Sequence, residues 1–183
     1  MSQPPRNLLT AAFPLFLLRE LPFERFAFPR WQSWLALVLI GLLVGLDPGY
    51  RAGAPQLPLA AVMGANVLLV LLLTPLVVTL LRVWLKRGGR WDGQGELFNL
   101  LVASWLLPDV LGAGLTALGV PALLTVPLWL YSVWVTGNAL AGAIPRVSLA
   151  YTVAGVLLSV VVSLLLYGLG LGLILAAVGG MYG

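Results

Sequence analysis

Five long apolar stretches between Trp31 and Gly180 constrain the fold of this chain more than any other feature. The hydrocarbon core of a bilayer is about 30 Å thick, so a helix needs about 20 mostly apolar residues to cross it with its backbone amides bonded internally. Hydrophobic residues make up 61% of the 183 residues and charged residues only 9%, unlike a soluble domain. The sequence therefore predicts an all-α fold, a polytopic membrane helical bundle with five transmembrane helices. The expected spans are Trp31 to Leu46, Pro58 to Leu81, Leu97 to Leu118, Pro121 to Ile144 and Val147 to about Leu173.

Residues 1–30 form a separate N-terminal segment ahead of the five-span membrane domain, residues 31–183. Its apolar run from Leu8 to Leu18 is roughly half as long as a spanning helix and contains Pro14. A short apolar run followed by charged residues and phenylalanines is typical of a helix that lies in the headgroup region. We therefore expect an interfacial N-terminal helix. The alternative is a re-entrant segment packed among the spans.

The cations predict the orientation of the bundle. Nine of the ten fall in alternate gaps between the spans, at Arg6, Arg19, Arg25 and Arg30, at Arg82, Lys86, Arg87 and Arg90, and at Arg146. Because cytoplasmic loops are enriched in Lys and Arg, the N-terminus and the loop after the second span are expected in the cytoplasm and the C-terminus outside. The cations are spread over three loops near the membrane and form no single patch, so no nucleic-acid partner is expected.

The chain contains neither cysteine nor histidine. Thiolate and imidazole metal sites, Ser/His catalysis and thiol redox chemistry are therefore excluded within it. A protease that uses two intramembrane carboxylates is also excluded, because Asp109 is the only acidic residue well inside a span. We expect no enzymatic activity, no cofactor and no metal site.

Asp109 is the centre of a candidate intramembrane polar site. A carboxyl group at that depth is costly unless it pairs, faces a wet cavity or is protonated. Three interpretations remain open: a carboxyl solvated near the outer interface, a hydrogen bond between helices, or a proton- or ion-coupled site. The candidate partners in other spans are Asn66, Asn138 and Ser132.

Two pairs of glycines give small-residue faces that allow helices to approach closely: Gly41 with Gly45, and Gly168 with Gly172. Packing inside the bundle is the favoured use, and homodimerisation is the alternative.

The most polar element is the cytoplasmic loop that contains Lys86, Arg87, Gly88, Gly89, Arg90 and Trp91. It lacks the G-K-[ST] ending and the preceding strand of a phosphate-binding loop. The favoured interpretation is a basic turn held at the anionic membrane surface, with its tryptophans at headgroup level.

The glycine turn at Gly88 and Gly89, the span with Ala103 to Pro108 and the next span with Pro127 to Ser132 resemble the Yip1-domain family of five-span membrane proteins. The resemblance covers roughly residues 30–180. It implies a non-enzymatic integral membrane protein that organises membranes or scaffolds partner proteins, with the lipid bilayer and other membrane proteins, or a second copy, as its partners. The histidine-containing basic turn of the family after the fourth span is missing, as is the acidic tyrosine motif of its eukaryotic members, so a Rab-binding role is not carried over.

The predominance of arginine over lysine and the abundance of Ala, Gly, Pro and Leu are typical of a GC-rich genome and favour a bacterial inner-membrane protein. The alternative function is a small transporter or channel, or a transporter subunit, that uses Asp109 and its polar neighbours. An odd number of spans without an evident internal repeat is unlike the usual two-repeat transporter.

Overall fold

The computed structural model describes residues 7–47 and 57–182, which form helices joined by turns and contain no strand. The short elements are α1 (Leu8–Phe16), the 3-10 turns η1 (Phe23–Phe26) and η2 (Arg87–Gly89), and α2 (Arg30–Val44). The long helices are α4 (Leu59–Lys86), α5 (Leu97–Ala117), α6 (Ala122–Ala143) and α7 (Leu149–Tyr182). The prediction of an all-α fold is therefore confirmed.

Four of these helices, α4, α5, α6 and α7, are long and apolar enough to cross a membrane. The prediction of a full-length first span is wrong, because α2 contains only 15 residues. At 1.5 Å per residue it is about 22 Å long, which is less than the thickness of the hydrocarbon core. The helix ends at Val44. Gly45 is its C-cap, with its amide still bonded to the carbonyl of Gly41, and Gly45 and Leu46 form a turn.

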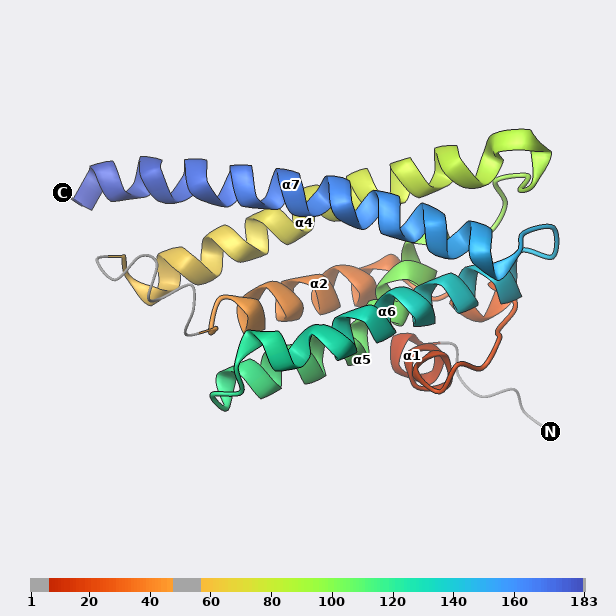
Figure 1. The fold of residues 1–183 in the computed structure, drawn as a ribbon, viewed down its shortest axis with the longest axis horizontal. Coiled ribbons are helices and arrows are strands. Elements are labelled where there is room, and N and C mark those ends of the chain that lie inside the picture. Colours follow the sequence, from red (N-terminus) through yellow and green to blue (C-terminus); the bar gives the residue numbers. More distant parts are fainter. Residues whose placement is uncertain (1–6, 48–56, 183) are drawn as a thin grey trace.

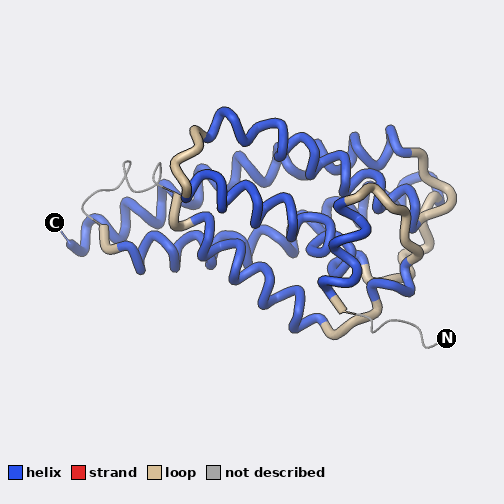
Figure 2. The backbone as a smooth tube through the Cα atoms, turned by 90° about the horizontal axis from the view of Figure 1, so that it is seen from below, coloured by secondary structure: helices blue, strands red, loops and turns tan. Residues whose placement is uncertain are grey.

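Five helices pack in a closed ring. In order of contact the ring runs from α2 to α4, α7, α6 and α5, and α5 returns to α2. Figures 1 and 2 show these helices side by side along the long axis of the molecule. The turn between α4 and α5 and the turn between α6 and α7 lie at one end, whereas the α5–α6 turn and the C-terminus lie at the other (Figure 1). The short helix α2 thus occupies the place in the bundle that the sequence assigns to the first span.

The contact between α2 and α4 depends on two glycines. A Cβ atom added at Gly41 would lie 2.7 Å from Cα of Val67, and one added at Gly45 would lie 2.7 Å from Cα of Met63. No larger residue fits at this distance without moving one helix, so the prediction of internal packing at this glycine pair is confirmed. Among the described residues, a Cβ at Gly168 or Gly172 would meet nothing within 4 Å, so that pair makes no close helix contact there.

The N-terminal helix α1 runs across the bundle and is seen nearly end-on in Figure 1. Asn7 caps it: its side-chain oxygen accepts the amide of Thr10 at 2.9 Å. One face of α1, formed by Leu8, Ala11, Ala12 and Leu15, is buried against α5 and α6, whereas Leu9 and Phe13 on the other face are exposed. A helix with one apolar face on the bundle and another facing outward fits both the interfacial and the re-entrant interpretation, and its depth in the membrane stays a prediction.

Candidate functional site

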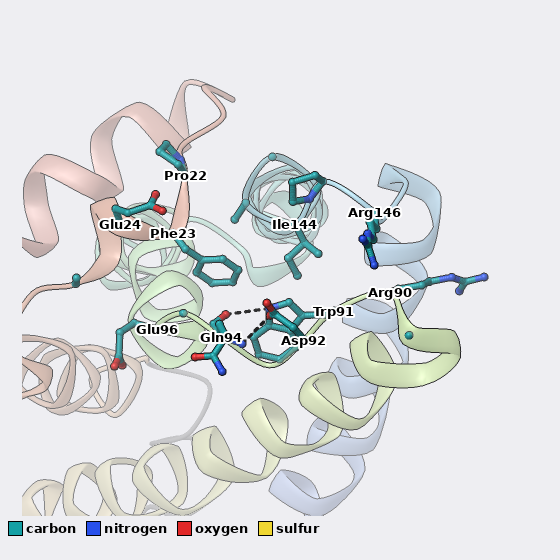
Figure 3. Close-up of a pocket in the computed structure, with 16 residues that line it drawn as sticks. Pro22, Phe23, Glu24, Arg90, Trp91, Asp92, Gln94, Glu96, Ile144 and Arg146 are labelled. Atoms are coloured by element: carbon teal, nitrogen blue, oxygen red, sulfur yellow. Dashed lines mark hydrogen bonds between the residues drawn. The ribbon is translucent and has the colours of Figure 1, made fainter.

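A cleft of about 940 Å³ opens at the end of the bundle that carries the α4–α5 turn. Three segments far apart in the sequence form it: η1 with its flanking residues, the loop after η2, and the turn between α6 and α7. Figure 3 shows side chains from all three segments around it. The lining residues are Pro22, Phe23, Glu24, Ala27, Gly89, Arg90, Trp91, Asp92, Gln94, Gly95, Glu96, Gly142, Ala143, Ile144, Pro145 and Arg146.

The loop on one side of the cleft is held by its own hydrogen bonds. The indole Nε1–H of Trp91 donates to the carbonyl of Gln94 at 2.9 Å, and the amide of Gln94 donates to Oδ1 of Asp92 at 2.8 Å (Figure 3). Gly93 and Gly95 have φ of 87° and 98°, which side chains other than glycine rarely adopt. The indole is buried and stacks on the ring of Phe23, with ring centroids 6.0 Å apart. The stacked pair therefore fastens the loop to the N-terminal segment and gives the cleft an aromatic wall.

Two charged groups at the cleft are already engaged elsewhere. Glu96 forms an ion pair with Arg30 at 3.0 Å, which ties α5 to the start of α2. The guanidinium of Arg90 lies 4.0 Å from the ring centroid of Tyr151, and its side chain extends away from the cleft (Figure 3). Glu24, Asp92 and Arg146 remain as the charged groups directed at the cleft, with Glu24 and Arg146 on opposite sides of it (Figure 3).

The structure divides the six residues of the predicted cytoplasmic loop between two places. Gly89, Arg90 and Trp91 line the cleft, whereas Lys86, Arg87 and Gly88 do not. Arg87 instead lies over the ring of Trp84, 5.8 Å from its centroid. Gly88 and Gly89 both have φ of 67°, so they allow the chain to leave α4 in a tight turn.

No hydrogen bond among the described residues joins the four residues of the candidate intramembrane site to one another. Asn66 donates to the carbonyl of Val62 at 2.8 Å and accepts the hydroxyl of Tyr167. Asn138 donates to the carbonyl of Leu18 at 3.0 Å, and Ser132 donates to the carbonyl of Trp129, in its own helix, at 2.7 Å. None of these bonds reaches Asp109, which is partly buried in α5 directly after Pro108.

Sequence reasoning missed Asn99, whose side chain makes three hydrogen bonds to other segments of the chain. Its side chain is fully buried near the start of α5 and donates to the carbonyls of Phe26 and Phe28, both at 2.8 Å. Its Oδ1 accepts the hydroxyl of buried Ser33 in α2, also at 2.8 Å. Asn99 thus joins three segments: α5, α2 and the chain that follows η1. An asparagine in the first turn of a span could have indicated such contacts, because a buried side-chain amide needs hydrogen-bond partners for both its oxygen and its NH₂ group.

Further polar contacts join the long helices. Ser104 of α5 and Thr136 of α6 are buried with their hydroxyl oxygens 3.0 Å apart, and Thr152 of α7 donates to the carbonyl of Gly137 in α6 at 2.8 Å. Within the described residues, every fully buried side-chain nitrogen or oxygen has a hydrogen-bond partner. The interior is thus joined by local hydrogen bonds and does not present a row of free polar groups.

No protein-family model, no curated protein and no solved structure was found to match this chain. The resemblance to the Yip1-domain family therefore stays a prediction.

Proposed function

We propose that this chain is a non-enzymatic integral membrane protein of Yip1-like type that organises the membrane or scaffolds partner proteins from its cytoplasmic end. The observation that carries the proposal is the contrast between the two parts of the bundle. Within the described residues, every fully buried side-chain nitrogen or oxygen of the long helices has a hydrogen-bond partner in the protein, whereas the cleft at the bundle end presents Glu24, Asp92 and Arg146 to its surroundings. Recognition is therefore expected at that end, and passage of a solute through the helices is not.

The proposal includes five membrane-embedded helices, with α2 as the fifth. The ring packing supports this, because α2 packs against both α4 and α5. Its other side exposes Leu35, Leu39 and Leu42, which suits contact with lipid. Modest local thinning of the bilayer accommodates a helix that is several ångströms short.

The orientation in the proposal follows from the cations. Arg82, Lys86, Arg87, Arg90 and Arg146 lie at or next to the two turns at the cleft end of the bundle, and Arg6 and Arg51 lie outside the described residues. The positive-inside rule then puts the cleft in the cytoplasm of a bacterial cell and the C-terminus outside the inner membrane.

Labelling of single cysteines tests this topology, because the chain has none of its own. Cysteines at Leu46 and Leu118, both exposed and at the end opposite the cleft, are expected to react with an impermeant thiol reagent in intact cells. A cysteine at Gln94 is expected to react only after the cells are opened. Reaction of Gln94 in intact cells would contradict the orientation, and protection of Leu46 together with labelling of Leu118 would contradict the crossing of α2.

Substitution of Asp109 distinguishes the proposed scaffold function from the alternative transporter function. We expect Asp109→Asn to change stability in detergent by at most about 1 kcal/mol, because no hydrogen bond or ion pair of this carboxyl occurs within the described residues. The wild-type protein in liposomes is expected to show no proton or ion flux above empty vesicles. The proteins captured with it from native membranes in mild detergent are expected to be the same for the wild type and Asp109→Asn.

A coupling carboxylate behaves differently, since only an ionisable group can carry a proton through a cycle. Flux that appears with the wild type, persists with Asp109→Glu and disappears with Asp109→Asn would replace the scaffold proposal by the transporter. Loss of flux with Asn66→Ala as well would extend that site to α4.

A further inference from the structure

We propose that α1 and residues 17–20 form a re-entrant element. It enters the membrane at the cleft end of the bundle, reaches the depth of the middle of α6 and returns to the same end, with the exposed face of α1 against the acyl chains of that leaflet. The inference goes beyond the proposed function. It holds in either orientation of the bundle, because it refers only to the end at which the cleft lies.

The C-terminal end of α1 lies beside the middle of α6. The carbonyl of Phe16, the last residue of α1, accepts the hydroxyl of Tyr131, and the centroids of their rings are 5.4 Å apart. α6 ends at Ala143, which lines the cleft, and at 1.5 Å per residue Tyr131 lies about 18 Å before that end. The whole of α6 is about 33 Å long, close to the thickness of about 30 Å of the hydrocarbon core. Figure 1 accordingly shows α1 beside α6 and well inside the end of that helix.

The chain that follows α1 returns along α6 to the cleft. The carbonyl of Leu18 accepts the side-chain amide of Asn138 at 3.0 Å, which is two turns of α6 nearer the cleft than the contact of α1. A Cβ atom added at Gly142, in the last turn of α6, would lie 2.7 Å from Cβ of Glu20. Successive residues after α1 therefore contact α6 at positions closer and closer to the cleft end.

α1 also begins at the cleft end. The amide of Leu8 donates to Oε1 of Gln32, in the first turn of α2, at 2.9 Å. The ion pair between Arg30 and Glu96 puts this first turn beside the start of α5, and Glu96 lines the cleft. The segment thus enters and leaves the bundle at one end.

The polarity of the segment agrees with this path. None of the nine residues of α1 is charged, and charges appear at Arg19 and Glu20, where the chain is back at the last turn of α6. Leu9 and Phe13 are 67% and 61% exposed, and Leu17 after them is exposed as well. Acyl chains cover such side chains without the cost of hydrating apolar surface.

The backbone at the end of α1 needs no water. The last four carbonyls of a helix have no partner inside it, and in hydrocarbon each must find one in the protein. The carbonyls of residues 13–15 accept amides of residues 17–19. The fourth, that of Phe16, accepts the hydroxyl of Tyr131 from α6. All four carbonyls are therefore bonded within the protein, as a helix end inside the membrane requires.

Nitroxide labels at single cysteines measure depth in liposomes by electron paramagnetic resonance, and the chain has no cysteine of its own. The ratio of accessibility to oxygen over accessibility to the polar complex nickel-EDDA rises with depth. At Phe13→Cys this ratio is expected to exceed that at Gln94→Cys, in the exposed loop, at least about tenfold, because the complex loses its hydrogen bonds with water in hydrocarbon. Leu130→Cys and Trp134→Cys, at exposed positions of α6, are the matched depth references. The Phe13 label is expected to lie no shallower than the Trp134 label.

Three results at Phe13 would overturn the proposal. A label shallower than that at Trp134 would put α1 in the headgroup region. A ratio as low as that at Gln94 would put α1 in water. Low accessibility to both oxygen and the nickel complex would mean that protein, and not lipid, covers the exposed face of α1.

Reaction of the unlabelled cysteines with a water-soluble maleimide checks the return of the chain independently. In opened membranes, Arg19→Cys, at an exposed position, is expected to react as fast as Gln94→Cys. Phe13→Cys is expected to react at least about tenfold more slowly, because the reactive thiolate does not form in apolar surroundings. Equal rates at Phe13 and Arg19 would contradict the re-entrant path. None of these results affects the flux and capture measurements that test the proposed function, and ion flux through the wild type would leave the path of α1 unchanged.

Discussion

Asn99→Ala is expected to destabilise the protein by about 3 kcal/mol and to release the chain around η1 from the bundle. The substitution leaves the carbonyls of Phe26 and Phe28 and the hydroxyl of Ser33 without their partner in a fully buried place. Each buried polar group that loses its hydrogen bond costs about 1–3 kcal/mol, and solvent reaching the opened segment recovers part of this. Denaturation in detergent measures the loss of stability, and hydrogen exchange over residues 7–29 measures the release.

Asn138→Ala is the matched control for this experiment. It also removes an amide that bonds to a carbonyl of the N-terminal segment, but only one such bond is lost, to Leu18, and it lies in an exposed position. Its expected cost is below about 1 kcal/mol. Equal losses for the two variants would show that the bonds of Asn99 do not hold the segment in place.

The long helices were predictable from the sequence because hydrophobicity and length carry the information for a membrane span. The length of α2 could not be predicted in the same way. The apolar run from Trp31 to Leu46 is continuous in hydropathy, but Gly45 ends the helix before the run ends. Helix ends depend on local caps and backbone conformation, which hydropathy does not measure.

The packing of the glycine pair Gly41 and Gly45 was predictable as a close helix contact, although its partners Val67 and Met63 were not. Small residues at i and i+4 identify a face, and the tertiary fold decides what lies against it. The second pair, Gly168 and Gly172, has the same spacing and no such contact. The spacing therefore indicates only that this face allows another helix to pack closely. Whether a helix lies there depends on the tertiary fold.

No hydrogen bond among the described residues joins Asp109 to its predicted partners, for a related reason. Asp109, Asn66, Asn138 and Ser132 were grouped because each is polar and lies in an apolar span. Such a grouping ignores where each side chain lies along and around its helix. The contacts of Asn99 join residues 66 to 73 positions apart, and no periodicity in the sequence predicts them. The cleft was missed likewise, because its three segments meet only in the fold.

The double variant Gly41→Ala with Gly45→Ala is expected to lower the free energy of unfolding by about 3 kcal/mol. Each added Cβ would lie 2.7 Å from a Cα atom of α4, and backbone cannot move aside as a flexible side chain can. Overpacking of this kind costs about 1–3 kcal/mol at each site, and the better helix propensity of alanine returns less than about 1 kcal/mol. Because α2 contacts both α4 and α5, separation of α2 from α4 also opens the ring.

Gly64→Ala with Gly168→Ala is the matched control, since it adds the same two methyl groups to membrane helices at places where a Cβ meets nothing within 4 Å. This control is expected to leave stability unchanged or to raise it slightly through helix propensity. Thermal denaturation of both proteins in the same detergent compares the two effects. A double variant at Gly41 and Gly45 as stable as the control would mean that α2 does not pack on α4 through these glycines. The short helix would then lose the contact that holds it in the ring, and the proposal of a fifth membrane-embedded helix would lose its main support.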